Sequence, residues 1–176
     1  MDGNQLDIKV KTAKFIDKNN SIIQEFYFAH PETKVKINYI YNGHWTGSQL
    51  WRLGCQEQMK LESTYNKSVK MVFDLPWATH RYLIEPLTGL PHVKKVLVNR
   101  FLSFVRMIRK SSKIAISQLL ETILSDVRFT TGCNMRNIML MAEKNTIGEL
   151  EMGGVDIKYH DTDSDTVAEC QHYDMT

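Results

Sequence analysis

Helical periodicity recurs in nearly every segment of the chain and constrains the fold more than any other feature. Between residues 56 and 74, apolar side chains recur at intervals of four, four and three, which places them on one face of a helix. These side chains are Leu61, Tyr65, Val69 and Val72. Similar patterns predict helices over 6–16, 22–28, 91–110, 116–127 and 134–144. We therefore expect an all-α fold, a small bundle of at least five helices with almost no strand.

Proline, glycine and small polar residues mark the expected helix boundaries. Pro31 and Pro91 suit the first turn of a helix, because proline there loses no hydrogen bond. Thr79 is a candidate cap for a short helix that Pro86 should end. The sequences NNS at 19–21 and TTG at 130–132 are expected to interrupt the helical pattern.

The chain is expected to contain one helical domain, residues 1–144, followed by a tail, residues 145–176. Within the domain, the glycine-rich and tryptophan-rich stretch 43–55 predicts a packed loop in which Trp45 and Trp51 anchor the core. The tail is acidic and shows no sustained period, so disorder is the natural expectation there.

The net charge of +2 hides a strong asymmetry along the chain. Residues 1–110 hold 17 Lys and Arg against 9 Asp and Glu, a net charge of +8. Residues 111–176 hold 5 against 11, a net charge of −6. The basic part is where a polyanion would bind. The alternative is that surface charge merely fluctuates along the chain.

Several kinds of chemistry lack the residues they need. No apolar run approaches the roughly 18 to 20 residues of a membrane span, and no secretory signal is seen, so we expect an intracellular protein, nuclear or cytoplasmic, without a membrane partner. The three cysteines form no zinc or disulfide pattern, and no glycine-rich phosphate loop is present. The sequence DTDSD at 161–165 lacks the glycine and glutamate of a calcium loop. No metal, cofactor, small-molecule substrate or catalytic residue is predicted.

A basic surface is the remaining candidate site. Residues 91–120 contain seven Lys and Arg and no Asp or Glu, whereas a solvated helix usually mixes both signs. At about 100° per residue, Lys95, Asn99, Ser103, Arg106 and Lys110 lie together opposite the apolar face. In the preceding helix, Lys60, Ser63, Lys67 and Lys70 group in the same way. The predicted nucleic-acid-binding residues are Lys60, Lys67, Lys70, Arg81, Lys95, Arg100, Arg106, Arg109 and Lys110. A merely basic exposed face is the alternative.

Three spaced segments carry a family resemblance. They are YIYNGHWTGSQLWRL (39–53), LESTYNKSVKMVFDLPWATHRYLIEPLTGLPHVKKVLVNRFLSFVRMIRKS (61–111) and DVRFTTGCNMRNIMLM (126–141). Together they resemble the region after the palm in reverse transcriptases of non-LTR retrotransposons, of the jockey-like long interspersed element kind. The resemblance implies a helical thumb that grips RNA, DNA or their hybrid and that packs beside a palm domain in the full-length parent.

The resemblance does not extend to catalysis. The chain has no YxDD and no adjacent pair of aspartates at a strand turn, and these are the carboxylates that a polymerase palm needs to hold Mg²⁺. We therefore expect a fragment of an RNA-directed DNA polymerase that is not itself an enzyme. The alternative function is a protein-interaction module, in which the apolar side of residues 91–129 docks the palm or another partner.

Overall fold

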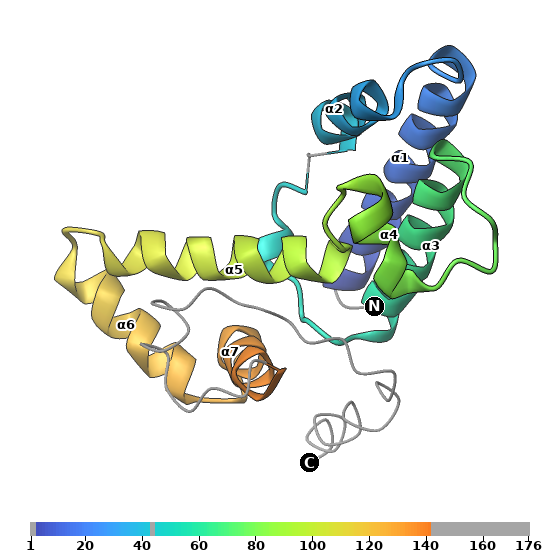
Figure 1. Ribbon diagram of the computed structural model, residues 1–176. Coiled ribbons are helices and arrows are strands. Elements are labelled where there is room, and N and C mark those ends of the chain that lie inside the picture. Colours follow the sequence, from blue (N-terminus) through green and yellow to red (C-terminus); the bar gives the residue numbers. More distant parts are fainter. Residues whose placement is uncertain (1–2, 43–44, 142–176) are drawn as a thin grey trace. The chain divides into compact units, whose positions relative to one another are not determined.

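The computed structural model describes residues 3–42 and 45–141, and these residues form helices joined by short connections (Figure 1). In chain order the elements are α1 (Gly3–Glu25), α2 (Pro31–Asn42), the 3-10 turn η1 (Ser48–Leu50), α3 (Gln56–Val72), α4 (Arg81–Thr88), α5 (Val93–Arg109), α6 (Ile114–Ser125) and α7 (Thr130–Met141). No strand occurs in the described ranges. The all-α prediction is confirmed, while the tail predicted over 145–176 lies outside the described residues.

Helix α1 passes through residues 19–21 without a break, so the predicted interruption is wrong. Asn19 is 1% exposed, and its side-chain Nδ2 donates to the Phe15 carbonyl at 2.9 Å. Its Oδ1 accepts from Nδ2 of Asn38 on α2 at 3.4 Å. An asparagine whose amide is satisfied in this way no longer competes with the helix backbone, so one helix replaces the two that were expected.

Helix α4 has different ends from those predicted. It begins at Arg81 after His80 rather than at a Thr79 cap, and it continues through Pro86. Proline removes only one hydrogen bond from this short helix, so the helix continues past it and ends at Gly89. Gly89 has a φ of 70°, and its N–H donates to the Glu85 carbonyl at 2.8 Å, which closes the helix in the usual left-handed manner.

The sequence TTG at 130–132 begins helix α7 and does not separate two elements, contrary to expectation. A Cβ atom on Gly132 would lie 2.2 Å from the Asp126 carbonyl oxygen and 2.6 Å from that of Ile123. Gly132 therefore lets α7 approach the end of α6 closely, and glycine is present here because of this contact.

The chain divides into two compact units, of which unit 1 comprises Met1–Ser48 and Cys55–Leu97. In unit 1, α1 packs against α2 and α3, and α3 packs against α4. The seven-residue spacing of Ile8, Phe15 and Ile22 places them on one face of α1, and each is at most 3% exposed. The Phe15 ring lies 5.6 Å from the ring of Trp45 and 5.4 Å from that of Tyr65, centroid to centroid. The predicted anchoring role of Trp45 is thus confirmed.

Unit 2 comprises Gln49–Gly54 and Val98–Thr176, and its described part ends at Met141. Here α6 packs against α7, and the short segment 49–54 is fastened to α7 by Asn134. This asparagine is fully buried, donates from Nδ2 to the Trp51 carbonyl at 2.7 Å and accepts the Leu53 N–H at Oδ1, also at 2.7 Å. Trp51 is 2% exposed, so it is the second core anchor that the sequence predicted.

Candidate nucleic-acid interface

The clearest basic surface of unit 1 is the α3 face, defined as Lys60, Ser63 and Lys67. All three side chains are exposed. The opposite side of α3 carries the predicted apolar stripe, whose four members are at most 5% exposed. Burial of that stripe fixes the rotation of the helix, so the lysines must face solvent. Within the described ranges, neither lysine forms an ion pair.

Lys70 and Arg81 were also predicted to bind nucleic acid, and the structure places them at the two ends of the connection between α3 and α4. Lys70 is half-buried, and its Nζ donates to the Trp77 carbonyl at 2.9 Å. This contact anchors the connection and directs the ammonium toward it. Arg81 is the half-buried first residue of α4.

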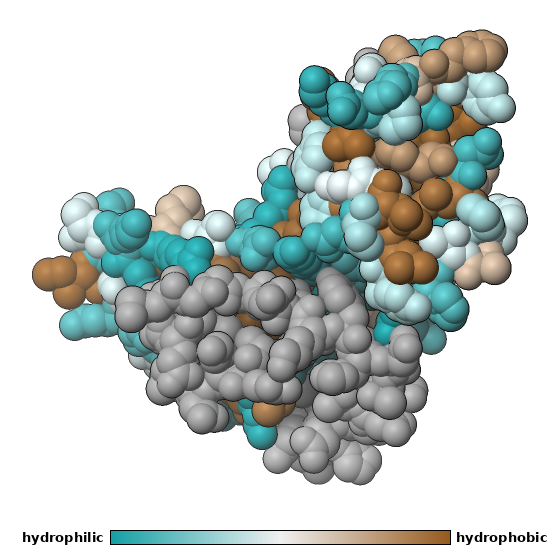
Figure 2. Space-filling model, in the orientation of Figure 1, coloured by the Kyte–Doolittle hydropathy of each residue, from teal (hydrophilic) through white to brown (hydrophobic). Residues whose placement is uncertain are grey.

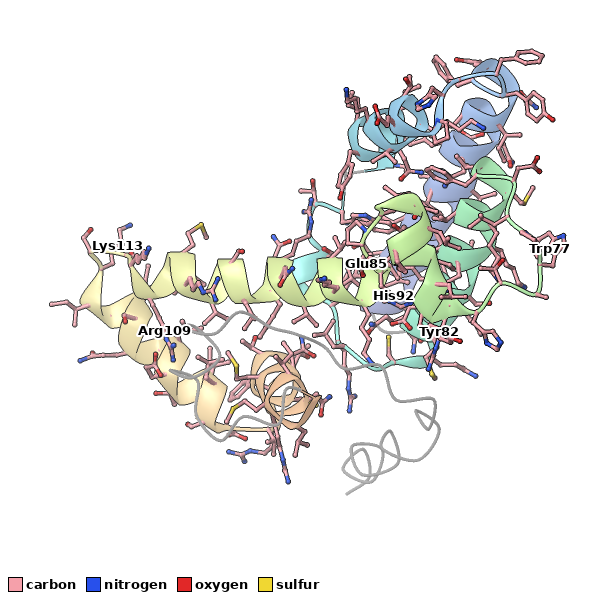
Figure 3. All side chains as sticks on the ribbon, viewed as in Figure 1. Trp77, Tyr82, Glu85, His92, Arg109 and Lys113 are labelled. Carbon is pink, nitrogen blue, oxygen red and sulfur yellow. The ribbon has the colours of Figure 1, made fainter. Side chains whose placement is uncertain are left out.

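Lys95, the predicted start of the α5 stripe, forms an ion pair within unit 1. Its Nζ lies 2.9 Å from Oε1 of Glu85 on α4, and both side chains are about one-third exposed. Glu85 and the neighbouring His92 are labelled in Figure 3. Helix α5 itself contains no acidic residue, as the sequence of 91–120 shows. The acid that pairs with Lys95 is Glu85, which belongs to α4. Because the Glu85 carboxylate partly neutralises the Lys95 ammonium, Lys95 should attract a phosphate less strongly than the acid-free sequence around it suggested.

The α5 face of unit 2 is defined as Asn99, Ser103, Arg106 and Lys110. Arg106 is half-buried and the other three residues are exposed, and α5 contains no acidic residue. On the opposite side, Phe101 and Val105 are 1% exposed. Hydrophilic residues follow the outer edge of this helix in Figure 2. The predicted grouping of cations with small polar donors on this part of α5 is present in the structure.

Arg109 and Arg100 complete the predicted set, and both are half-buried. Arg109 forms a two-point ion pair with Glu121 of α6: Nε lies 2.7 Å from Oε1, and Nη2 lies 3.1 Å from Oε2. This geometry holds the end of α5 against α6. Of the nine predicted residues, only Lys60, Lys67 and Lys110 are fully exposed, so the candidate interface is smaller than the sequence indicated.

Helix α6 carries exposed apolar side chains, within the region 91–129 whose apolar side was the alternative docking surface. Ile116, Leu119 and Val127 belong to the apolar pattern that predicted a helix over 116–127, and they are 42%, 59% and 45% exposed. Ile114, at the start of α6, is 73% exposed. Among the apolar residues of 114–127, Leu120 and Leu124 are the buried ones, because α7 covers that side of α6. The apolar residues of 114–127 occur on more than one face of the helix. This breadth could have indicated from the sequence that some of them would be exposed.

Groups of three His, Cys, Asp or Glu that could hold a metal ion do not occur within residues 3–42 and 45–141. Burial raises the pKa of the Cys55 thiol, which keeps it protonated near neutral pH. The DTDSD sequence lies outside the described residues. The helices of the described part are too short or too polar to cross a membrane.

Comparison with known proteins adds no assignment. No family model matches the chain, and neither curated proteins nor solved structures give a match. What the chain does must therefore be inferred from its own side chains.

Proposed function

We propose that the chain is a retroelement-derived, thumb-like helical module that binds the backbone of template and primer, and that it has no polymerase active site of its own. The observation that carries the proposal is the α5 face. Cations and uncharged hydrogen-bond donors share one exposed surface of a helix that contains no acid. The α3 face repeats this combination with Lys60, Ser63 and Lys67.

Such surfaces suit phosphates better than base edges. Lysine and arginine contacts to phosphate oxygens position a protein on nucleic acid without reading its sequence, and small polar side chains add hydrogen bonds to the same oxygens. The ion pairs of Lys95 and Arg109 reduce the attraction that these two cations offer to phosphates. We therefore expect weak binding with little sequence preference, as suits a thumb that must slide along its substrate.

The salt dependence of binding tests this function. Each phosphate neutralised should steepen the log–log plot of affinity against salt by roughly 0.7 to 0.9. With Lys60, Lys67, Arg106 and Lys110 each contacting one phosphate, the slope for an RNA–DNA hybrid should be about three to four. Fluorescence anisotropy with labelled duplexes of different sequence measures it. Binding that is absent at low ionic strength, or independent of salt, would contradict the proposal.

A protein-interaction module is the second candidate, and the exposed apolar residues of α6 favour it. Ile116 and Leu119 are both exposed and, three residues apart, lie on one side of α6, and exposed apolar surface of this kind marks contact surfaces. In this reading the partner is the palm domain of the full-length parent. Titration of the chain with a separately expressed non-LTR palm should give saturable binding that Leu119→Ser weakens. Equal affinity of the variant and the natural chain would argue against α6 as the contact.

A further inference from the structure

The connection between α3 and α4 carries large aromatic side chains in solvent. Trp77 is 66% exposed, and Tyr82, in the first turn of α4, is 53% exposed. The His80 ring stacks on the Tyr82 ring, with centroids 5.4 Å apart and planes 23° apart. Both Trp77 and Tyr82 project from unit 1 in Figure 3. Trp77 on the connection and Tyr82 at the start of α4 thus present flat rings to solvent.

Backbone hydrogen bonds fix this connection. The Leu75 N–H donates to the Lys70 carbonyl at 2.8 Å, and the Thr79 N–H donates to that of Pro76 at 2.9 Å. Lys70 Nζ holds the Trp77 carbonyl, as described above. Asp74 adopts a φ of 55°, which turns the chain sharply after α3. A ring presented by a fixed backbone loses little conformational entropy when it binds a ligand.

Basic residues neighbour the rings along the chain, and one of them, Lys70, contacts the Trp77 carbonyl. Lys67 and Lys70 lie on the last turns of α3, and Arg81 lies between the stacked His80 and Tyr82 in sequence. Asp74 is the one acidic residue of the connection, and Glu85 of α4 is engaged with Lys95. Aromatic planes beside cations are the combination that proteins use for unpaired bases, because every base has a π-face and carries a phosphate with it.

We propose that Trp77 and the stacked His80–Tyr82 pair form a stacking site for unpaired bases of single-stranded nucleic acid. The proposal rests on the proposed backbone-binding function and adds a ligand class to it. Duplex phosphates contact the α3 face, while a single strand passes the α3–α4 connection and stacks on it. Leu83 and Leu87, which follow Tyr82 on α4, are also exposed.

A second exposed aromatic pair in unit 1 provides a matched control. Tyr27 and Phe28 contact each other edge to face, and Phe28 is 94% exposed. Lys34 Nζ already lies 5.8 Å from the Tyr27 ring centroid, and the acidic residues Glu25 and Glu32 flank the pair in sequence. These two acids add negative charge to this part of the chain, so we expect the pair to attract a phosphate less than the α3–α4 connection does.

Tryptophan fluorescence reports on the site directly. The chain has three tryptophans, and Trp45 and Trp51 are buried, so Trp77 is the tryptophan whose fluorescence a stacked base can quench. The natural chain is titrated with a twelve-nucleotide oligothymidylate and with an abasic oligomer of the same length and charge. We expect quenching by oligothymidylate only. Trp77→Ala or Tyr82→Ala should weaken oligothymidylate binding about fivefold or more, whereas Trp77→Phe and Phe28→Ala should bind nearly as the natural chain does.

The outcomes separate the two proposals. Oligothymidylate and the abasic oligomer binding equally, without quenching, would overturn the stacking site and leave backbone binding intact. No binding of either oligomer or of a duplex would overturn both proposals. Far-UV circular dichroism of each alanine variant should match the natural chain, because the replaced side chains are more than half exposed. A variant that keeps its helical content but loses no affinity for oligothymidylate would also overturn the stacking site.

Discussion

Helices α3 and α6 have similar sequence patterns but very different surroundings. Both carry apolar residues at helical spacing. On α3 all four predicted core residues are buried, because α1 and α4 pack over them. On α6 Leu120 and Leu124 face α7, whereas Ile116 and Leu119 face solvent. Periodicity therefore identifies the apolar face of a helix, but whether another element covers that face depends on contacts distant in sequence.

Truncating one leucine on each helix tests this difference and should give the largest effect. Leu61→Ala removes a fully buried side chain and should lower the free energy of unfolding by about 2–5 kcal/mol. Leu119→Ala, at 59% exposure, should change it by less than about 0.5 kcal/mol. Urea unfolding followed by circular dichroism measures both. Equal losses would mean that Leu119 is buried in solution by another surface.

Asn134 tests whether polar contacts hold unit 2 where its apolar packing is incomplete. Asn134→Ala leaves the Leu53 N–H and the Trp51 carbonyl buried without their partner, and should cost about 2–4 kcal/mol. Asn137→Ala on the same helix is the control, because Asn137 is half-buried whereas Asn134 is fully buried. The same urea assay applies. A loss for Asn134→Ala no larger than that of the control would show that the buried contacts contribute little.

Gly132 tests the close approach of α7 to α6. Gly132→Ala would normally strengthen a helix, but the added Cβ would overlap two backbone carbonyl oxygens. We expect a net loss of about 1–3 kcal/mol, because backbone atoms cannot move aside as a flexible side chain would. Thermal unfolding is the readout. A rise in the melting temperature would show that the two helices are farther apart than the structure places them.

Tyr65 tests a smaller contribution on the well-packed helix α3. Its hydroxyl donates to the Pro91 carbonyl at 2.9 Å, and burial raises the pKa of Tyr65, so the hydroxyl remains a donor up to alkaline pH. Tyr65→Phe keeps the ring stacking on Phe15 and should cost about 1 kcal/mol. Tyr39→Phe, on an exposed residue of α2, should cost nothing measurable. If Tyr65→Phe left the free energy of unfolding unchanged, apolar packing alone would account for the stability of α3.

Local sequence predicted the helices and the rotation of α3 and α5 well, because buried stripes such as Leu61, Tyr65 and Val69 dominate those patterns. It failed where tertiary contacts override a local signal. Asn19 and Gly132 were interpreted as helix breaks, yet one is satisfied by α2 and the other serves a close helix contact. The acids that pair with Lys95 and Arg109 belong to α4 and α6, so inspection of α5 alone could not reveal them.

Charge reversal on α3 tests the central claim most directly. Lys60→Glu with Lys67→Glu alters the α3 face, and Lys9→Glu with Lys14→Glu makes the same change in net charge at exposed positions of α1. We expect the first pair to lower the salt slope for hybrid binding by roughly 1.5 to 2, with helical content unchanged, and the second pair to alter it far less. Equal effects of the two pairs would show that binding follows net charge alone, and no effect of either would contradict the proposed interface on α3.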